Sequence, residues 1–387
     1  MRTAQVSRSI SSALRLNADF AEAIALGSKV GAAPFIHRTK HVASDWLVRQ
    51  LQDLKKRRDD VASRTVSSYD LLGLPAGIPK PDWLAKLGSE LEESAVPYIP
   101  FALGTNVDSA YTSGAESYWL LCTDPFLRES SHGKYRPETM FGIWRHSRVY
   151  RPAKDSFFHL CPFHNAVTSG TVQHTITWKH ATFESVVVQF ADDITWIIEN
   201  LSDAALLEDS PSRLFRQFKN RLGETAPVGF TQPLDESDAG GLYTYFISDF
   251  IDSSRKTLTE TAAADLRLRL REGADDATIG LSHEAANMLE KMRAFLDDVV
   301  FQAPRIYNRN LVLDNISKIA LDLLYGKQSP LDRFIDSHSD AEDWTDVERE
   351  RARKLLRNDV HRAQLAVDVY ASLGDQEVFE LIGLERI

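Results

Sequence analysis

The chain has 387 residues, a hydrophobic share of 43% and a formal net charge of −10. This balance argues against a protein that coats nucleic acid, because phosphate binding requires clustered lysines and arginines. The only cysteines are Cys122 and Cys161, which favours a reducing compartment over a disulfide scaffold. No apolar run reaches membrane-spanning length, and the first residues lack the apolar stretch of a signal peptide. A soluble cytoplasmic protein without membrane or nucleic-acid partners is expected.

Helical periodicity dominates the sequence. Apolar residues recur at spacings of three and four, and each such stripe predicts a helix with one face in the core. The clearest stripes are Val6, Ile10 and Leu14; Val187, Phe190, Ile194, Ile197 and Leu201; Leu214, Phe215, Phe218 and Leu222; Met288, Met292, Phe295 and Val299; and Ile316, Ile319, Ala320 and Leu323. The sequence therefore predicts a mainly α-helical fold.

Two stretches depart from helical periodicity. Residues 70–180 hold many of the prolines, glycines and aromatic residues, so short strands and long loops are predicted there. Residues 266–271 (LRLRLR) alternate leucine with arginine, and this period of two predicts a half-buried strand. Its arginines either contact phosphate groups or belong to a solvated edge strand.

Four segments carry the most specific patterns. The first is residues 17–37, NADFAEAIAL followed by GSKVGAAPFIH. The second is residues 190–204, FADDITWIIENLSDA, in which Asp192, Trp196 and Asn200 recur every four residues and so share a helix face. The third is GIWRHS at residues 142–147, and the fourth is DVYASLGD at residues 368–375.

Together these segments resemble the motifs of the HD-domain deoxynucleoside triphosphate triphosphohydrolases (the dGTPase family), in the family's order. The resemblance implies a mainly α-helical, HD-domain-like core with a few short strands in the middle region. In this interpretation residues 1–60 form the N-terminal part of the core and 61–180 a divergent insertion. Residues 181–300 complete the core, and 301–387 form helices packed on it. Residues 43–135 match none of the motifs.

The resemblance is weakest at the residues that bind metal. Family members hold a divalent ion with two histidines and two aspartates, and the ion activates the attacking hydroxide. The adjacent His-Asp pair of the family falls on Ser28 and Lys29, and the next histidine falls on Ala32. Only the last aspartate is retained, as Asp192. Because an ammonium group has no lone pair to donate, we expect no family-type metal site and no cofactor.

Lys29 is open to two interpretations. It either fills the vacated metal position and pairs with Asp192, or it points to solvent. The pairing would compensate a carboxylate that is costly to bury alone. Ser28, Lys29 and His37 are thus vestigial catalytic positions, and Asp192 is a vestigial metal ligand.

The family resemblance also suggests residues that would contact a nucleotide. These candidates are His37, Arg145, His146, Trp196 and Asp375. For His37 the alternative is a histidine fixed by hydrogen bonds at a helix start. For Arg145 and His146 the alternative is a solvated basic turn.

A rival group of possible metal ligands lies in the middle of the chain. His159, Cys161 and His164 are closely spaced, and His174 and His180 follow. Zinc accepts histidine and cysteine at such spacings. No Cys-x-x-Cys pair accompanies them, so ordinary loop and core histidines are the alternative.

Three functional hypotheses remain. The first is a catalytically impaired dGTPase-like protein that binds a dNTP such as dGTP, or that serves as a regulatory or assembly subunit. Such a subunit would form homo-oligomers or pair with an active paralogue. The second is an active dNTP triphosphohydrolase with a rebuilt site for Mn²⁺ or Mg²⁺. The third is a structural interaction protein that binds no nucleotide.

Overall fold

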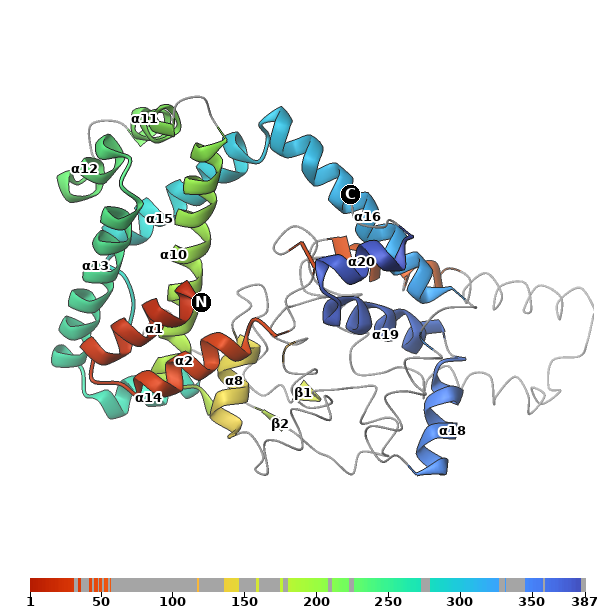
Figure 1. Cartoon of the computed structure of the whole chain (residues 1–387). Coiled ribbons are helices and arrows are strands. Elements are labelled where there is room, and N and C mark those ends of the chain that lie inside the picture. The colour runs from red at the N-terminus through yellow and green to blue at the C-terminus, as the bar shows by residue number, and fades with distance from the viewer. Residues whose placement is uncertain are drawn as a thin grey trace, which may run out of the picture. The chain divides into compact units, whose positions relative to one another are not determined.

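The computed structural model describes part of the chain and is mainly helical there (Figure 1). The described residues are 1–30, 34–35, 42–43, 45–47, 49–50, 52–54, 56, 117, 136–145, 158–159, 175–176, 180–207, 211–222, 226–272, 279–326, 331, 345–357 and 359–383. The chain forms two compact units. The first contains residues 1–30, 133–158 and 176–312, and the second contains 31–132, 159–175 and 313–387.

The first unit is built from helices. In chain order they are α1 (Arg2–Ala13), α2 (Ala18–Gly27), α8 (Pro137–Arg145), α10 (Phe183–Leu206), α11 (Pro211–Leu222), α12 (Val228–Glu236), α13 (Ala239–Glu260), α14 (Ala263–Arg271), α15 (His283–Phe295), the π-helical turn η4 (Leu296–Val300) and the start of α16 (Pro304–Tyr325). None of the described helices has both the length and the apolarity needed to span a bilayer.

Side-chain caps fix the start of three of these helices. Asn17 accepts a hydrogen bond from the Phe20 N–H at 3.0 Å and so begins α2. Thr182 caps α10 through the Ser185 N–H at 3.3 Å, and Ser282 caps α15 in the same way. A capping oxygen satisfies an N–H group that has no partner inside the helix, which stabilises the helix by about 1 kcal/mol.

Helix α10 forms the centre of the first unit. Its side chains Val187, Ile194 and Ile197 are fully buried. Helices α1, α2, α8, α11, α13 and α15 all contact it. The Phe190 ring stacks on Phe250 of α13 with 4.1 Å between ring centroids. Because α10 is surrounded on most sides, it holds in place every residue of the 190–204 segment singled out in the sequence.

Helix α1 packs closely through a stripe of small hydroxyl side chains. Thr3, Ser7 and Ser11 are all buried and recur every four residues, on one face of the helix. The buried Ser7 hydroxyl donates a hydrogen bond to the Thr3 carbonyl at 2.8 Å. Small side chains let neighbouring backbones approach, so the start of the chain lies directly against α2 and α10.

The contact between α8 and α2 is equally close at Gly142. A Cβ atom at this position would lie 2.6 Å from Cδ1 of Ile24, which is fully buried. We expect Gly142→Ala to lower the free energy of unfolding by about 1–3 kcal/mol, because a packed core resists an added methyl group. Chemical denaturation measures this. Gly280→Ala is the control, since nothing lies within 4 Å of its Cβ position; an equal loss there would contradict the close packing at Gly142.

The strand predicted at residues 266–271 is wrong, because this segment is the end of helix α14. Leu266 and Leu270 are buried, whereas Leu268 is exposed. A leucine at every second residue also places leucines four residues apart, and that spacing meets on one helix face. The arginines lie between them, and the Arg267 guanidinium sits over the Phe183 ring at 5.8 Å.

The second unit contains the rest of α16 together with α18 (Asp346–Leu355), α19 (Asp359–Ser372) and α20 (Asp375–Leu381). Tyr370 of α19 is fully buried and donates a hydrogen bond to the Ser317 hydroxyl of α16 at 2.8 Å. Trp46 donates from Nε1 to Asp322 at 2.8 Å and packs edge-on against Tyr325. These contacts fasten one side of α16.

The buried face of α16 differs from the predicted one. Ala320 is buried as expected, but Ile319 and Leu323 are exposed. The residues that face the core are Asp314, Ser317, Ala320, Leu321 and Leu324. The prediction took the more apolar stripe for the buried face, and the structure buries the face that contains Ser317 and Asp314.

Little of the middle region is described. Strands β1 (Phe158–His159) and β2 (Thr175–Ile176) pair in a two-stranded sheet. The other strands and loops predicted between residues 70 and 180 fall largely outside the described residues.

Candidate functional site

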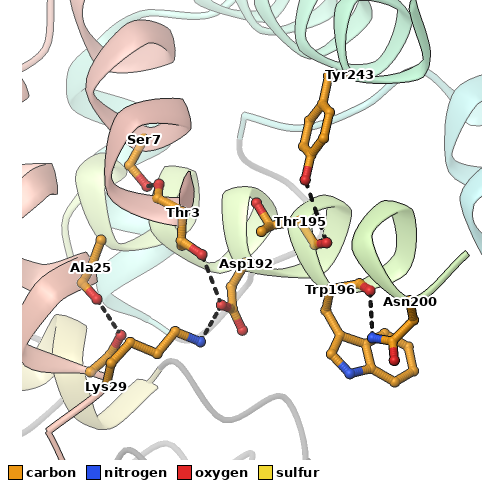
Figure 2. A network of polar contacts seen from close by, with 10 residues as sticks. Thr3, Ser7, Ala25, Lys29, Asp192, Thr195, Trp196, Asn200 and Tyr243 are labelled. Carbon is orange, nitrogen blue, oxygen red and sulfur yellow. Dashed lines mark hydrogen bonds and ion pairs between the residues drawn. The ribbon is translucent and has the colours of Figure 1, made fainter. Parts of the chain in front are cut away.

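An ion pair joins two of the four motif segments, residues 17–37 and residues 190–204. Lys29 follows the end of α2, and its ammonium donates a hydrogen bond to Oδ1 of Asp192 on α10 (Figure 2). Thr3 of α1 donates to the same oxygen at 3.3 Å. The Asp192 side chain is 17% exposed and that of Lys29 is 38% exposed. Of the two interpretations of Lys29, the pairing with Asp192 is confirmed.

Ser28 does not take part in this ion pair. It is fully buried, and its hydroxyl donates to the Ala25 carbonyl of its own helix at 2.9 Å. A serine hydroxyl that satisfies a backbone carbonyl one turn earlier is a local, structural arrangement. The segment that resembles the family's His-Asp pair therefore contributes one cation and no metal-ligating side chain to the site.

These residues do not fit a divalent metal ion. Asp192 is the only carboxylate of the group, and a hydroxyl and an ammonium already bind its Oδ1. A metal of the kind that HD-type proteins hold requires several histidine and carboxylate ligands. Among the described residues, no cluster of three or more His, Cys, Asp or Glu side chains is arranged to bind a metal.

The neighbouring carboxylate is paired as well. Asp193 lies 3.4 Å from the Arg293 guanidinium of α15, and both side chains are largely buried. Arg293 also contacts Glu290 at 3.1 Å. The two adjacent aspartates of α10 are thus neutralised by cations from different helices, Lys29 beside α2 and Arg293 on α15. Each pair fixes a helix against α10.

Trp196 and Asn200 lie further along the same helix (Figure 2). The Asn200 side-chain amide donates to the Trp196 carbonyl at 2.7 Å, so its hydrogen bond stays within helix α10. The Trp196 ring is half-buried and packs against Phe301, with 5.9 Å between centroids. Both side chains have intramolecular contacts, and the prediction that Trp196 contacts a nucleotide stays open.

A tyrosine connects α13 to α1 and α10. The Tyr243 hydroxyl donates to the Thr195 carbonyl at 3.5 Å, and Arg2 lies over its ring at 5.6 Å. Arg2 also pairs with Glu199 at 3.4 Å. Burial raises the pKa of Tyr243 above that of a free tyrosine, so its hydroxyl remains protonated and able to donate at neutral pH.

Asp375 has a structural contact in the second unit. Its carboxylate accepts a hydrogen bond from the Phe35 N–H at 2.7 Å, and the Phe35 ring packs edge-on against Phe379. Phe35 has a φ of 59°, a left-handed conformation that is uncommon for a bulky residue. Asp375 and Phe379 of α20 therefore hold Phe35 in this uncommon backbone conformation.

We expect Asp375→Ala to lower the free energy of unfolding by about 1 kcal/mol, because it removes the acceptor of the Phe35 N–H and an acidic residue at the start of α20. Hydrogen exchange should become faster at the Phe35 amide. Gln376→Ala is a matched control on the same exposed helix end. Unchanged exchange at Phe35 in the Asp375 variant would show that the contact does not hold this residue.

The remaining candidates are only partly described. Arg145 is the last residue of α8, and His159 lies in β1. His180 precedes α10. His37, His146, Cys161, His164 and His174 lie outside the described residues. The predicted nucleotide contacts of His37, Arg145 and His146 and the alternative metal site therefore remain predictions.

Three residues of the site belong to no sequence motif. They are Thr3, Arg293 and Tyr243, and each contacts α10 from a distant part of the chain. A signal for Thr3 was present in the series Thr3, Ser7 and Ser11, whose spacing of four marks a polar stripe on an otherwise apolar helix face. Arg293 and Tyr243 had no comparable signal.

No protein-family model matches the chain, and no curated protein matches it. The resemblance to the dGTPase family thus rests on the four sequence segments.

Proposed function

We propose that the chain is a dGTPase-like protein in which the Lys29–Asp192 ion pair stands where related enzymes hold a metal ion. In this proposal it binds a deoxynucleoside triphosphate without efficient hydrolysis and serves as a regulatory or assembly subunit. The supporting observation is that Lys29 and Asp192, which occupy metal-ligand positions in the resemblance, contact each other across 163 residues of sequence. An HD-like helical core is part of the same proposal.

The loss of hydrolysis follows from the charge of Lys29. A metal ion accepts electron pairs from a phosphoryl oxygen and from water, and it lowers the pKa of that water. An ammonium carries one positive charge and has no open coordination position. It can attract a phosphate group, but it cannot generate a bound hydroxide. The site would therefore keep part of the electrostatic attraction for a triphosphate and lose the source of the nucleophile.

Nucleotide binding is supported by the accessibility of Lys29. More than a third of its side chain is exposed, so a phosphate group can approach the ammonium while Asp192 remains beside it. Lysine commonly binds phosphate as a compact point charge. Because the whole chain is acidic and repels anions at long range, an anionic ligand needs a local cation such as the exposed Lys29 ammonium.

The test combines ligand-dependent melting with an assay for tripolyphosphate release. Each of the four dNTPs is added to the full chain, with inorganic tripolyphosphate as a further probe. At a hundredfold excess over Kd, binding to the native state adds about 2.7 kcal/mol, which corresponds to a melting-temperature rise of about 3 °C. We expect this rise with at least one dNTP, and no tripolyphosphate release with Mn²⁺ or Mg²⁺.

A matched lysine provides the control. Lys219 pairs with Asp235 at 2.6 Å, and its side chain is 36% exposed, close to the value for Lys29. The ligand-dependent rise should disappear in Lys29→Ala and persist in Lys219→Ala. Release of tripolyphosphate that Asp192→Ala abolishes would instead establish an active enzyme with a rebuilt metal site. The absence of a melting shift with every dNTP would favour the structural interaction protein.

A further inference from the structure

Helix α16 has apolar side chains on two faces. One face, which includes Ala320, Leu321 and Leu324, is buried in the protein. On another face Val312 is 58% exposed, Ile319 50% and Leu323 44%. A helix that is apolar on both sides is usually buried on both sides. Some surface is therefore expected to cover the second face when the protein is in its functional state.

The spacing of the apolar residues on this face indicates what covers it. The exposed Val312, Ile319 and Leu323 and the half-buried Ile316 lie at positions 312, 316, 319 and 323, at intervals of four, three and four residues. This is the spacing of the d and a positions of two successive heptads, with β-branched residues at three of the four places. At about 100° per residue these side chains form one narrow stripe, which we call the α16 seam. Such a seam is suited to pairing with another helix of the same spacing.

The α16 seam is complementary to itself in the antiparallel direction. A two-fold axis between Ile316 and Ile319 would place Val312 opposite Leu323 of a second copy, and Ile316 opposite Ile319. Each apolar residue then meets an apolar residue, and the same patch serves both partners, as a closed two-fold dimer requires. No other partner has to be invoked to fill the surface.

The charges at the two ends of the α16 seam support the same direction. Arg309 lies one turn before Val312, is exposed and has no ion-pair partner among the described residues. At the other end the helix finishes at Tyr325 with its carbonyl groups, and Asp322 is on its last turn. Antiparallel pairing would set Arg309 opposite the C-terminal end of the partner helix, where cations are stabilised by the helix dipole. Parallel pairing would instead bring the two arginines together.

We infer that two copies of this chain associate through antiparallel contact of their α16 seams. The inference does not depend on nucleotide binding, because no residue of the α16 seam takes part in the Lys29–Asp192 pair. Two heptads give a short interface, so the dimer is expected to form at micromolar concentrations and to dissociate on dilution.

Sedimentation velocity of the full chain between about 1 and 100 µM tests this inference. We expect a concentration-dependent monomer–dimer equilibrium that Ile319→Lys shifts at least tenfold toward the monomer, because a lysine in the middle of an apolar seam is desolvated on both chains. Leu311→Lys is the matched control: Leu311 is also an exposed apolar residue of α16, but it lies about 110° around the helix from the seam. The Leu311→Lys chain should dimerise like the unmodified chain.

Circular dichroism and melting temperature establish that both variants remain folded. A chain that stays monomeric at 100 µM would overturn the inference and would show that the α16 seam is covered by other residues of the same chain. A dimer that persists in Ile319→Lys would overturn it too, because the interface would then lie elsewhere. Disulfide formation between Val312→Cys and Leu323→Cys chains, with none in Leu323→Cys alone, would identify the antiparallel direction.

Discussion

Phe250→Ala is expected to lower the free energy of unfolding by about 3–5 kcal/mol, a large share of the stability of an average domain. Phe250 of α13 is buried and stacks on Phe190 of α10 at 4.1 Å between centroids. Its removal would leave a cavity between the central helix and α13, and it would also remove an aromatic pair worth about 1 kcal/mol. Urea denaturation followed by circular dichroism measures the loss.

A matched aromatic residue distinguishes this packing from a general effect of removing a ring. Tyr307 of α16 is 42% exposed, and Tyr307→Ala should change the stability by less than about 0.5 kcal/mol. Similar losses for Phe250→Ala and Tyr307→Ala would mean that Phe250 is not part of a well-packed core between α10 and α13.

Lys29→Glu should turn the internal ion pair into a cation site. The glutamate side chain is one bond shorter than that of lysine, so its carboxylate would reach close to the place of the ammonium beside Asp192. Without a cation the two carboxylates repel each other, and we expect a loss of about 2 kcal/mol. Millimolar Mn²⁺ or Ca²⁺ should restore about 1–2 kcal/mol by binding only the native state. Melting temperatures with and without chelator give both values.

The neutral variant Lys29→Gln separates charge from side-chain removal. It loses the ion pair but adds no carboxylate, so its melting temperature should fall less and should not respond to divalent cations. The unmodified chain should not respond through this site either. If Mn²⁺ left Lys29→Glu as unstable as before, the position of the Lys29 ammonium would not be one that a metal ion can occupy.

The sequence was most informative about the helices. The stripe at Val187, Phe190, Ile194, Ile197 and Leu201 predicts α10, and all five residues are buried along it. A long apolar stripe on one face can only be satisfied by burial, so its period shows both the helix and its inner face. The same argument holds for Leu214, Phe215, Phe218 and Leu222 in α11.

Two segments show where periodicity is not sufficient. At Leu266–Arg271 a period of two fits a strand, but the buried pair Leu266 and Leu270 fits a helix equally well, and the packing of the leucines decides between them. In α16 two apolar stripes compete. Ser317 of the less apolar stripe hydrogen-bonds to Tyr370 of α19, a residue 53 positions later, and periodicity cannot reveal such a contact.

The candidate site was predictable only in part. The charge of Asp192 and the unusual position of Lys29 suggested a pair, and the structure shows this pair although the Lys29 side chain stays partly exposed to solvent. Arg293 was not predictable, because the contact with Asp193 depends on how α15 packs on α10, 100 residues away. Residue types suggest which groups need partners, whereas helix packing determines which partner each one finds.

The contact between Thr3 and Asp192 also has a consequence for the order of events during synthesis. The two residues are 189 positions apart, and at about 5–20 residues per second the ribosome needs roughly 10 to 40 s to reach α10 after it has made α1. During this interval α1 and α2 can pack on each other and, once it has been made, on α8, but Val187, Ile194 and the rest of the central helix are still missing. The nascent chain therefore exposes the apolar faces of α1 and α2 for many seconds, a period in which a chaperone that binds short apolar helices would find them accessible.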